Sequence, residues 1–380
     1  MLTGPDQRPL ARKLGWAVLT LTSLAVVGIV FLRPADLPDV TGFGFAQETV
    51  RGEVVEVIEA TCSYASDLRC VRVSFELLEG PDVGSVTQEE WESIPSAPDF
   101  DVGDRVVLNR IPEAPPLQRY QFADRERRPL LIAAGLVFAA IVVVLGRLRG
   151  LAALAGLVLS VAVLLAYIVP AILSGRSPEI VALTGGVLIA VIALYLAHGI
   201  KPMTHVAAIG TLLSLGLTVA LAAVVTGLAE FSGLVSEEAG FLMAIGGFDL
   251  RGLLLAGIVL GALGALDDVT VTQASAVWEV AAANKELDQH HLFAAGLRVG
   301  RDHVASSVNT LLLAYAGAAM PLMLLFGLSG QRLGVVANSE VIAVEIVRTL
   351  VGSVGLVAAV PVTTWLAAKV VSPPKSHLVN

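Results

Sequence analysis

Long apolar runs separated by short polar connections make up most of this chain of 380 residues. A membrane-spanning helix needs about 20 predominantly apolar residues, and eight runs reach or approach that length. The runs lie at 14–32, 129–146, 151–173, 178–197, 205–228, 250–266, 306–327 and 341–368. With a mean hydropathy of +0.77 and only 15% charged residues, the pattern predicts an all-α polytopic membrane bundle of about eight transmembrane helices.

One long segment, 33–128, has a different pattern. Apolar and polar residues alternate along 50–58 and again along 70–80, which is the period of a β-strand. A further strand is expected after the turn residue Gly103. The segment therefore predicts a small β-barrel-like (OB-like) domain, and the proline-rich stretch 111–122 is expected to be a linker back to the membrane.

Two connections do not fit simple spans. Residues 229–249 are apolar at their centre but too short to cross a bilayer, so a re-entrant or interfacial segment is expected, with a break at Gly246 and Gly247. Residues 284–305 are polar. A helix is expected to begin within 285–303 and to continue into the next span.

Basic residues favour alternate connections, which orients the chain by the positive-inside rule. The predicted segments are a cytoplasmic N-terminus at 1–13, a transmembrane anchor at 14–32, an extracytoplasmic β-rich domain at 33–128, a multi-span domain at 129–371 and a cytoplasmic tail at 372–380. Arg125, Arg127 and Arg128 oppose this orientation. A signal peptide is the alternative for 14–32, but no small-residue cleavage site follows it.

The net charge of −8 is concentrated in 33–128, where 19 acidic and 10 basic residues give −9. The chain has no basic footprint for nucleic acid, so no nucleic-acid partner is expected. Both cysteines, Cys62 and Cys70, lie in this acidic segment. In an extracytoplasmic domain they could form a disulfide that closes a short hairpin; two free thiols are the alternative.

The stretch 257–284 carries the most unusual polar residues of the membrane domain. Two adjacent carboxylates, Asp267 and Asp268, close an apolar run. On a helical period, one face holds Asp268, Thr272, Ser275 and Glu279. Carboxylates near membrane depth are costly unless they are paired, solvated or functional. One interpretation is a cation or proton site with hydroxyl ligands; the other is a helix that leaves the membrane with solvated acids.

A second polar group begins the following helix. Its members are Arg298, Arg301, Asp302, His303 and Asn309. These residues could face the acidic stripe and neutralise it, and the alternative is ordinary cytoplasmic charge. Glu345 and Arg348, three residues apart in the last run, are expected to form an ion pair.

The chain contains no G-x-S-x-G, H-E-x-x-H or Walker A motif. His198 and His205 bracket a short loop, but two histidines alone are a weak metal signal. We therefore predict no enzymatic activity, no cofactor and no metal site.

Two long stretches carry a family resemblance: LRGLLLAGIVLGALGALDDVTVTQASAVWEV at 250–280 and LRVGRDHVASSVNTLLLAYAGAAMPLMLLF at 297–326. They resemble the YibE/F family of bacterial multi-pass membrane proteins, and the likeness extends over most of 129–368. Members of that family often have a single aspartate where this chain has Asp267 and Asp268. The resemblance implies a plasma-membrane location and this architecture, but it supplies no substrate.

Two functions follow as hypotheses. The first is a secondary transporter or permease with a polar site between the sixth and seventh spans, which moves an unknown small solute or ion through the lipid bilayer. The alternative is a non-transporting envelope scaffold or sensor that binds an envelope protein partner through residues 40–115.

Overall fold

A computed structural model describes residues 8–34, 48–95, 97–115 and 118–372 of the protein. Most of the expected cytoplasmic tail (372–380) and the first seven residues lie outside this part of the chain. The chain divides into two units. The helical unit comprises 1–38 and 142–380, and the β-unit comprises 39–141. Each is described by itself.

The β-unit is one antiparallel sheet with strand order β3-β2-β1-β4-β5. Its strands are β1 (Glu48–Cys62), β2 (Ala65–Leu77), β3 (Val86–Glu92), β4 (Arg105–Arg110) and β5 (Tyr120–Arg125). β1 is the central strand, pairing Val54 with Phe75 of β2 and Val50 with Leu108 of β4. A disulfide joins Cys62 to Cys70 beside the β1–β2 turn, with Cα atoms 4.9 Å apart.

The sheet curls into a half-barrel whose two outer strands approach each other through side chains. The Phe122 backbone N–H on β5 donates to Glu89 Oε2 on β3 at 2.6 Å. Behind this contact, Phe75, Trp91 and Phe122 form an aromatic core with ring centroids 5.9–6.4 Å apart. The expected barrel-like domain is confirmed as a curled five-stranded half-barrel.

The linker expected at 111–122 was wrong at its end, because β5 begins at Tyr120. Proline punctuates the start of that stretch, but Tyr120 is buried and its hydroxyl donates to Asp82 Oδ2 at 2.6 Å. The burial of Tyr120 and the packing of Phe122 in the aromatic core stabilise this segment as the strand β5 of the sheet.

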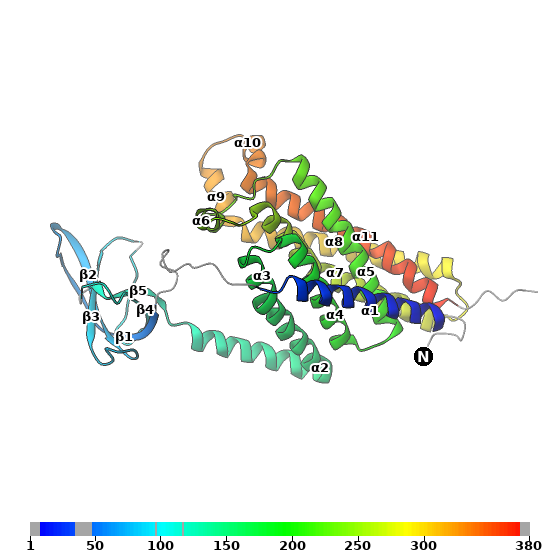
Figure 1. Ribbon diagram of the computed structural model, residues 1–380, viewed down its shortest axis with the longest axis horizontal. Helices are drawn as coiled ribbons and strands as arrows, with labels where there is room; N and C mark the ends of the chain where they lie inside the picture. Colours follow the sequence, from blue (N-terminus) through cyan, green and yellow to red (C-terminus); the bar gives the residue numbers. More distant parts are fainter. Residues whose placement is uncertain (1–7, 35–47, 96, 116–117, 373–380) are drawn as a thin grey trace, which may run out of the picture. The chain divides into compact units, whose positions relative to one another are not determined.

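The helical unit contains the remaining elements (Figure 1). They are α1 (Arg8–Phe31), α2 (Arg128–Val163, which begins in the β-unit), the π-helix η3 (Leu164–Ile168), α3 (Val169–Leu173), α4 (Pro178–His198), α5 (Pro202–Leu228), α6 (Glu237–Ile245), α7 (Leu250–Ala283), α8 (Gln289–Ala318), α9 (Met320–Leu328), α10 (Leu333–Asn338) and α11 (Glu340–Val371).

Within the described residues, six helices are long and apolar enough to span a membrane, or up to seven if α8 and α9, bent by 63°, form one span. The run from α2 to α3 counts once, although Arg147 leaves helical geometry at φ 52° and ψ −131°. At that break Gly150 packs against the Val142 carbonyl. The break falls between the expected runs 129–146 and 151–173. The multi-pass class is confirmed, and eight spans stay a prediction.

The connections follow the sequence pattern. α8 begins at Gln289, in the polar connection, and continues to Ala318. α6 has only nine residues. Its N-terminus is capped by the Ser236 hydroxyl, which accepts a hydrogen bond from the Ala239 N–H, and it ends before Gly246, where φ is +86°. The loop before α6 is tied to α11, because Glu340 Oε1 accepts from Ser232 N at 2.7 Å.

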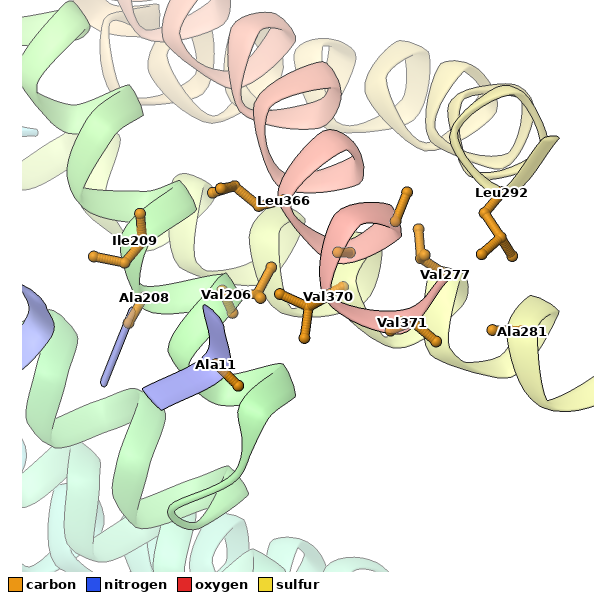
Figure 2. Close-up of a cluster of buried hydrophobic side chains, with 14 of the residues drawn as sticks. Ala11, Val206, Ala208, Ile209, Val277, Ala281, Leu292, Leu366, Val370 and Val371 are labelled. Atoms are coloured by element: carbon orange, nitrogen blue, oxygen red, sulfur yellow. The ribbon is translucent and has the colours of Figure 1, made fainter. Parts of the chain in front are cut away.

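α5, α7 and α11 run side by side and form the centre of the helical unit (Figure 1). Small residues allow the close approach: Gly355 of α11 contacts Thr218 of α5, and Gly210 of α5 contacts Thr363 of α11. Figure 2 shows one end of this core, where Ala11 of α1 and Leu292 of α8 join residues of α5, α7 and α11.

Enlarging Gly355 should therefore destabilise the helical unit. A Cβ at this position meets the Thr218 hydroxyl, and overpacking costs about 1–3 kcal/mol. We expect Gly355→Leu to lower the melting temperature of the detergent-purified protein. Gly216→Leu on α5 is the matched control, because nothing lies within 4 Å of its Cβ position. Equal melting temperatures for the two variants would contradict this account of the packing.

The contribution of Glu89 to the stability of the β-unit should fall as the pH rises above the acidic range. Burial raises the pKa of Glu89 above its ordinary value, and the hydrogen bond from Phe122 N–H opposes this only in part. Since the fold favours the protonated acid, its contribution is full below pH 4.5 and is lost as the pH rises through the folded-state pKa.

Glu89→Gln keeps the acceptor for Phe122 and removes the charge. After allowance for solvent screening of a half-exposed group, we expect an unfolding midpoint at pH 8 roughly 2–4 °C above wild type. This unfolding midpoint is measured by near-ultraviolet circular dichroism, which reports on the aromatic core. Glu92→Gln on the same strand is the control. A midpoint unchanged at pH 8, or raised equally by Glu92→Gln, would contradict the assignment.

Candidate functional site

The polar stripe predicted on α7 faces mainly outward. Asp268, Thr272 and Glu279 are exposed, and Ser275 is half-buried. The side chain of Asp268 is 74% exposed. α7 is a single helix from Leu250 to Ala283, as the unbroken pattern predicts.

The second predicted group, on α8, lies alongside. Arg298, Asp302 and Asn309 are exposed, whereas His303 is half-buried. The two helices bring one pair together: His303 Nε2 lies 4.0 Å from Asp268 Oδ2. At that distance and exposure an ion pair contributes less than about 1 kcal/mol.

The adjacent aspartate has a different environment. Asp267 lies at the middle of α7, and its Oδ1 atom is closed off from solvent with no hydrogen-bond partner among the described residues. The Thr211 hydroxyl on α5 is within hydrogen-bonding reach of the carboxyl. Thr211 Oγ1 also lies 2.7 Å from Thr270 Oγ1, which donates to the Asp267 carbonyl at 3.2 Å.

Nearly two turns further along α7, Gln273 joins three helices. Its Nε2 donates to the Gly296 carbonyl of α8 at 2.8 Å and to Thr364 Oγ1 of α11 at 2.7 Å. Gln273 is only 2% exposed. Gly296 and Gly300 leave room for it, since a Cβ at Gly300 would meet Gln273 Oε1.

Further hydroxyls in the same core keep unused hydrogen-bonding capacity. Thr363 Oγ1 of α11 and Ser214 Oγ of α5 are buried, and neither has a hydrogen-bond partner within the described ranges. Thr363 packs against Gly210, which also lies close to Thr270. The inner face of α7 thus meets buried hydroxyl groups of α5 and α11, and one of them, on Thr211, lies within reach of the Asp267 carboxyl.

A separate polar group lies at α11 and α8. The expected Glu345–Arg348 pair is formed, with Arg348 Nη1 at 2.8 Å from Glu345 Oε1. The Arg348 guanidinium also lies over the Tyr315 ring, 5.8 Å from its centroid. The pair satisfies Arg348 Nη1, whereas Arg348 Nε is buried without a hydrogen-bond partner among the described residues.

Three cavities of the helical unit are lined by other residues. A cavity of about 240 Å³ includes Arg176 and Asp249, one of about 230 Å³ includes Tyr315 and Glu345, and one of about 740 Å³ lies between α1 and α4. Asp267 lies in the wall of none of these three. It is held between packed helices.

Sequence reasoning missed Thr211, Thr270, Gln273 and Thr363. A signal was present on α7, where Asp267, Thr270, Gln273 and Val277 share one helical face. In the part of the chain that is described, no group of three or more His, Cys, Asp or Glu side chains could hold a metal ion. The chemistry that the site offers is one partly buried carboxylate with hydroxyl groups beside it.

Long apolar helices packed around a partly buried carboxylate define a multi-pass membrane protein. Comparison with protein families matches residues 134–373 to YibE/F-like protein. Because this match covers more than half of the chain, the protein belongs to the YibE/F-like family, which confirms the resemblance seen in the sequence. No curated protein and no solved structure matches the chain.

Gln273→Leu should weaken the contact among α7, α8 and α11. The substitution removes two interhelical hydrogen bonds, and such bonds contribute about 0.6 kcal/mol on average and up to roughly 1.7 kcal/mol in membrane proteins. We expect a lower midpoint in dodecyl sulfate unfolding. Thr272→Val, at the exposed neighbouring position, should leave the midpoint near that of wild type. The reverse order of midpoints would refute the role given to Gln273.

Proposed function

We propose that this protein is a secondary transporter or permease whose translocation site is built around Asp267. The observation that carries the proposal is the Asp267 Oδ1 atom, which is buried in a membrane-type helix core without a hydrogen-bond partner among the described residues. An ionisable residue inside a membrane bundle is costly, and such residues usually mark substrate, ion or proton paths.

The surroundings of Asp267 support this proposal over simple packing. A purely structural polar residue in such a core has its hydrogen bonds satisfied, as Gln273 does. Beside Asp267, by contrast, the Thr211 and Thr270 hydroxyls supply oxygen atoms, while Asp267 Oδ1 itself has no partner among the described residues. In this proposal, the cycle opens the packed contact between α5 and α7 to one side at a time.

We place the protein in the bacterial plasma membrane with both termini cytoplasmic and residues 33–128 outside. The distribution of basic residues supports this orientation. The start of α1, the end of α7, the start of α8 and the end of α11 share one hydrophobic cluster at the same end of the helical unit. Lys13, Lys285 and Lys369 belong to or adjoin these element ends.

The second candidate is an envelope scaffold or sensor that binds a protein partner through residues 40–115. The observation that favours it is that the β-unit has its own hydrophobic core and a disulfide. In this alternative, the membrane helices carry structure or signal. A flux experiment distinguishes the two, because a scaffold gives no flux above that of empty liposomes.

Asp267→Asn should abolish transport, whereas Asp268→Asn should not. Full-length protein reconstituted in liposomes with an internal pH-sensitive dye is exposed to proton, sodium or potassium gradients. We expect a wild-type flux that Asp267→Asn lowers by at least about tenfold, which corresponds to roughly 1.4 kcal/mol. Asp268→Asn makes the same chemical change at the exposed neighbour and should stay within about twofold of wild type.

Two results would count against the proposal. If Asp267→Asn and Asp268→Asn reduced the flux equally, the assignment of the site to Asp267 would be wrong. A wild-type flux no greater than that of empty liposomes, for these ions and for a panel of small organic acids, would favour the scaffold.

A further inference from the structure

A groove on the helical unit is formed by α1, α2, α4 and α5, and its volume is about 740 Å³. This volume lies within the range of about 300–1,000 Å³ that is typical of small-molecule sites. Most of the wall is apolar, including Leu19 of α1, Leu159 of α2 and Ile192 of α4. α1 packs directly against α4 and α5, so these walls belong to one packed arrangement (Figure 1).

The groove has a cationic residue on one helical face of α1. Arg12 lines the groove together with Gly15, Trp16 and Leu19, which follow it at helical spacing. Arg12 is near the start of α1, and Leu19 is two turns further along the helix. Among the described residues that line the groove there is no Asp or Glu. The charge of this wall is therefore positive.

A hydrogen-bonded pair adds a donor to the same groove. Tyr195 Oη lies 2.6 Å from His205 Nδ1. When the tyrosine hydroxyl donates to Nδ1, the ring proton lies on Nε2. Nε2 is the atom nearest to Gly15, 3.2 Å from the position of a Cβ there, and both residues line the groove. Glycine at position 15 lets this ring edge lie close to the backbone of α1, with no side chain between them.

We propose that this groove binds an anionic phospholipid. Its phosphate contacts the Arg12 guanidinium and the His205 Nε2–H, and one acyl chain lies along Leu19, Leu159 and Ile192. A charged patch at one end of an apolar wall is complementary to an amphiphile with an anionic headgroup, and basic pockets between membrane helices have this recognition chemistry. A free phosphate would leave the apolar wall unused, so we commit to the phospholipid. This inference does not depend on the transport proposal.

Native mass spectrometry of the detergent-purified full-length protein tests the proposal. Phosphatidylglycerol and phosphatidylcholine with identical acyl chains are the probes. We expect phosphatidylglycerol to bind in preference, and Arg12→Ala to reduce that preference by about fivefold, the factor expected for one cation near a lipid headgroup. Lys13→Ala is the matched control: it removes the same charge from the next residue, which does not line the groove.

A second variant tests the apolar wall. Ile192→Trp fills the groove and should reduce the adducts of both lipids, while Arg12→Ala affects the anionic lipid selectively. Melting temperatures without added lipid check that each variant is folded. The proposal is overturned if the two lipids bind equally to wild type, if Lys13→Ala and Arg12→Ala have the same effect, or if inorganic phosphate at the lipid concentration displaces bound phosphatidylglycerol.

Discussion

The close approach of α5, α7 and α11 is the constraint on which the rest of the helical unit depends. Helices in a bilayer gain little from the hydrophobic effect, so they associate by packing and by interhelical hydrogen bonds. Here glycine and threonine provide the contact surfaces, as in the Gly355–Thr218 and Gly210–Thr363 pairs. Threonine can occupy such a surface because its hydroxyl can bond a carbonyl of its own helix, as Thr218 does with Ser214.

This packing determines which polar groups need a further explanation. Gln273 is buried, but its amide N–H groups bond α8 and α11, so its position is explained by structure. The Asp267 Oδ1 atom is also closed off from solvent but has no such partner among the described residues. A buried amide whose N–H groups are bonded is a packing residue, whereas a buried carboxylate oxygen without a partner marks a functional candidate.

The sequence predicted where most helices and strands lie, but it was less informative about which face of each helix is buried. The helix at 250–283 could be predicted from an apolar run without proline. Its buried face could not, because Gly, Ala and Val occur all round it and the neighbouring helices decide which side is covered. The polar stripe Asp268–Glu279 was visible because charge stands out in an apolar segment. The inner layer is made by Thr211 and Thr363, which are distant in sequence, so only the fold shows that it exists. β5 was missed similarly, since its burial depends on an aromatic core assembled from β2, β3 and a loop.

The adjacent carboxylates are not one functional unit. Successive helical residues are rotated by about 100° around the axis, so Asp267 and Asp268 cannot both face α5. Asp267 is directed to the hydroxyl groups of that helix, and Asp268 is directed to the exposed side, where His303 is its neighbour. Water can solvate a largely exposed carboxylate, whereas the enclosed one depends on a few protein oxygen atoms and protons. Any step that changes the contact between α5 and α7 therefore alters the free energy of Asp267 far more than that of Asp268. This coupling between helix packing and a single carboxylate is the physical requirement for a transport site that opens to alternate sides.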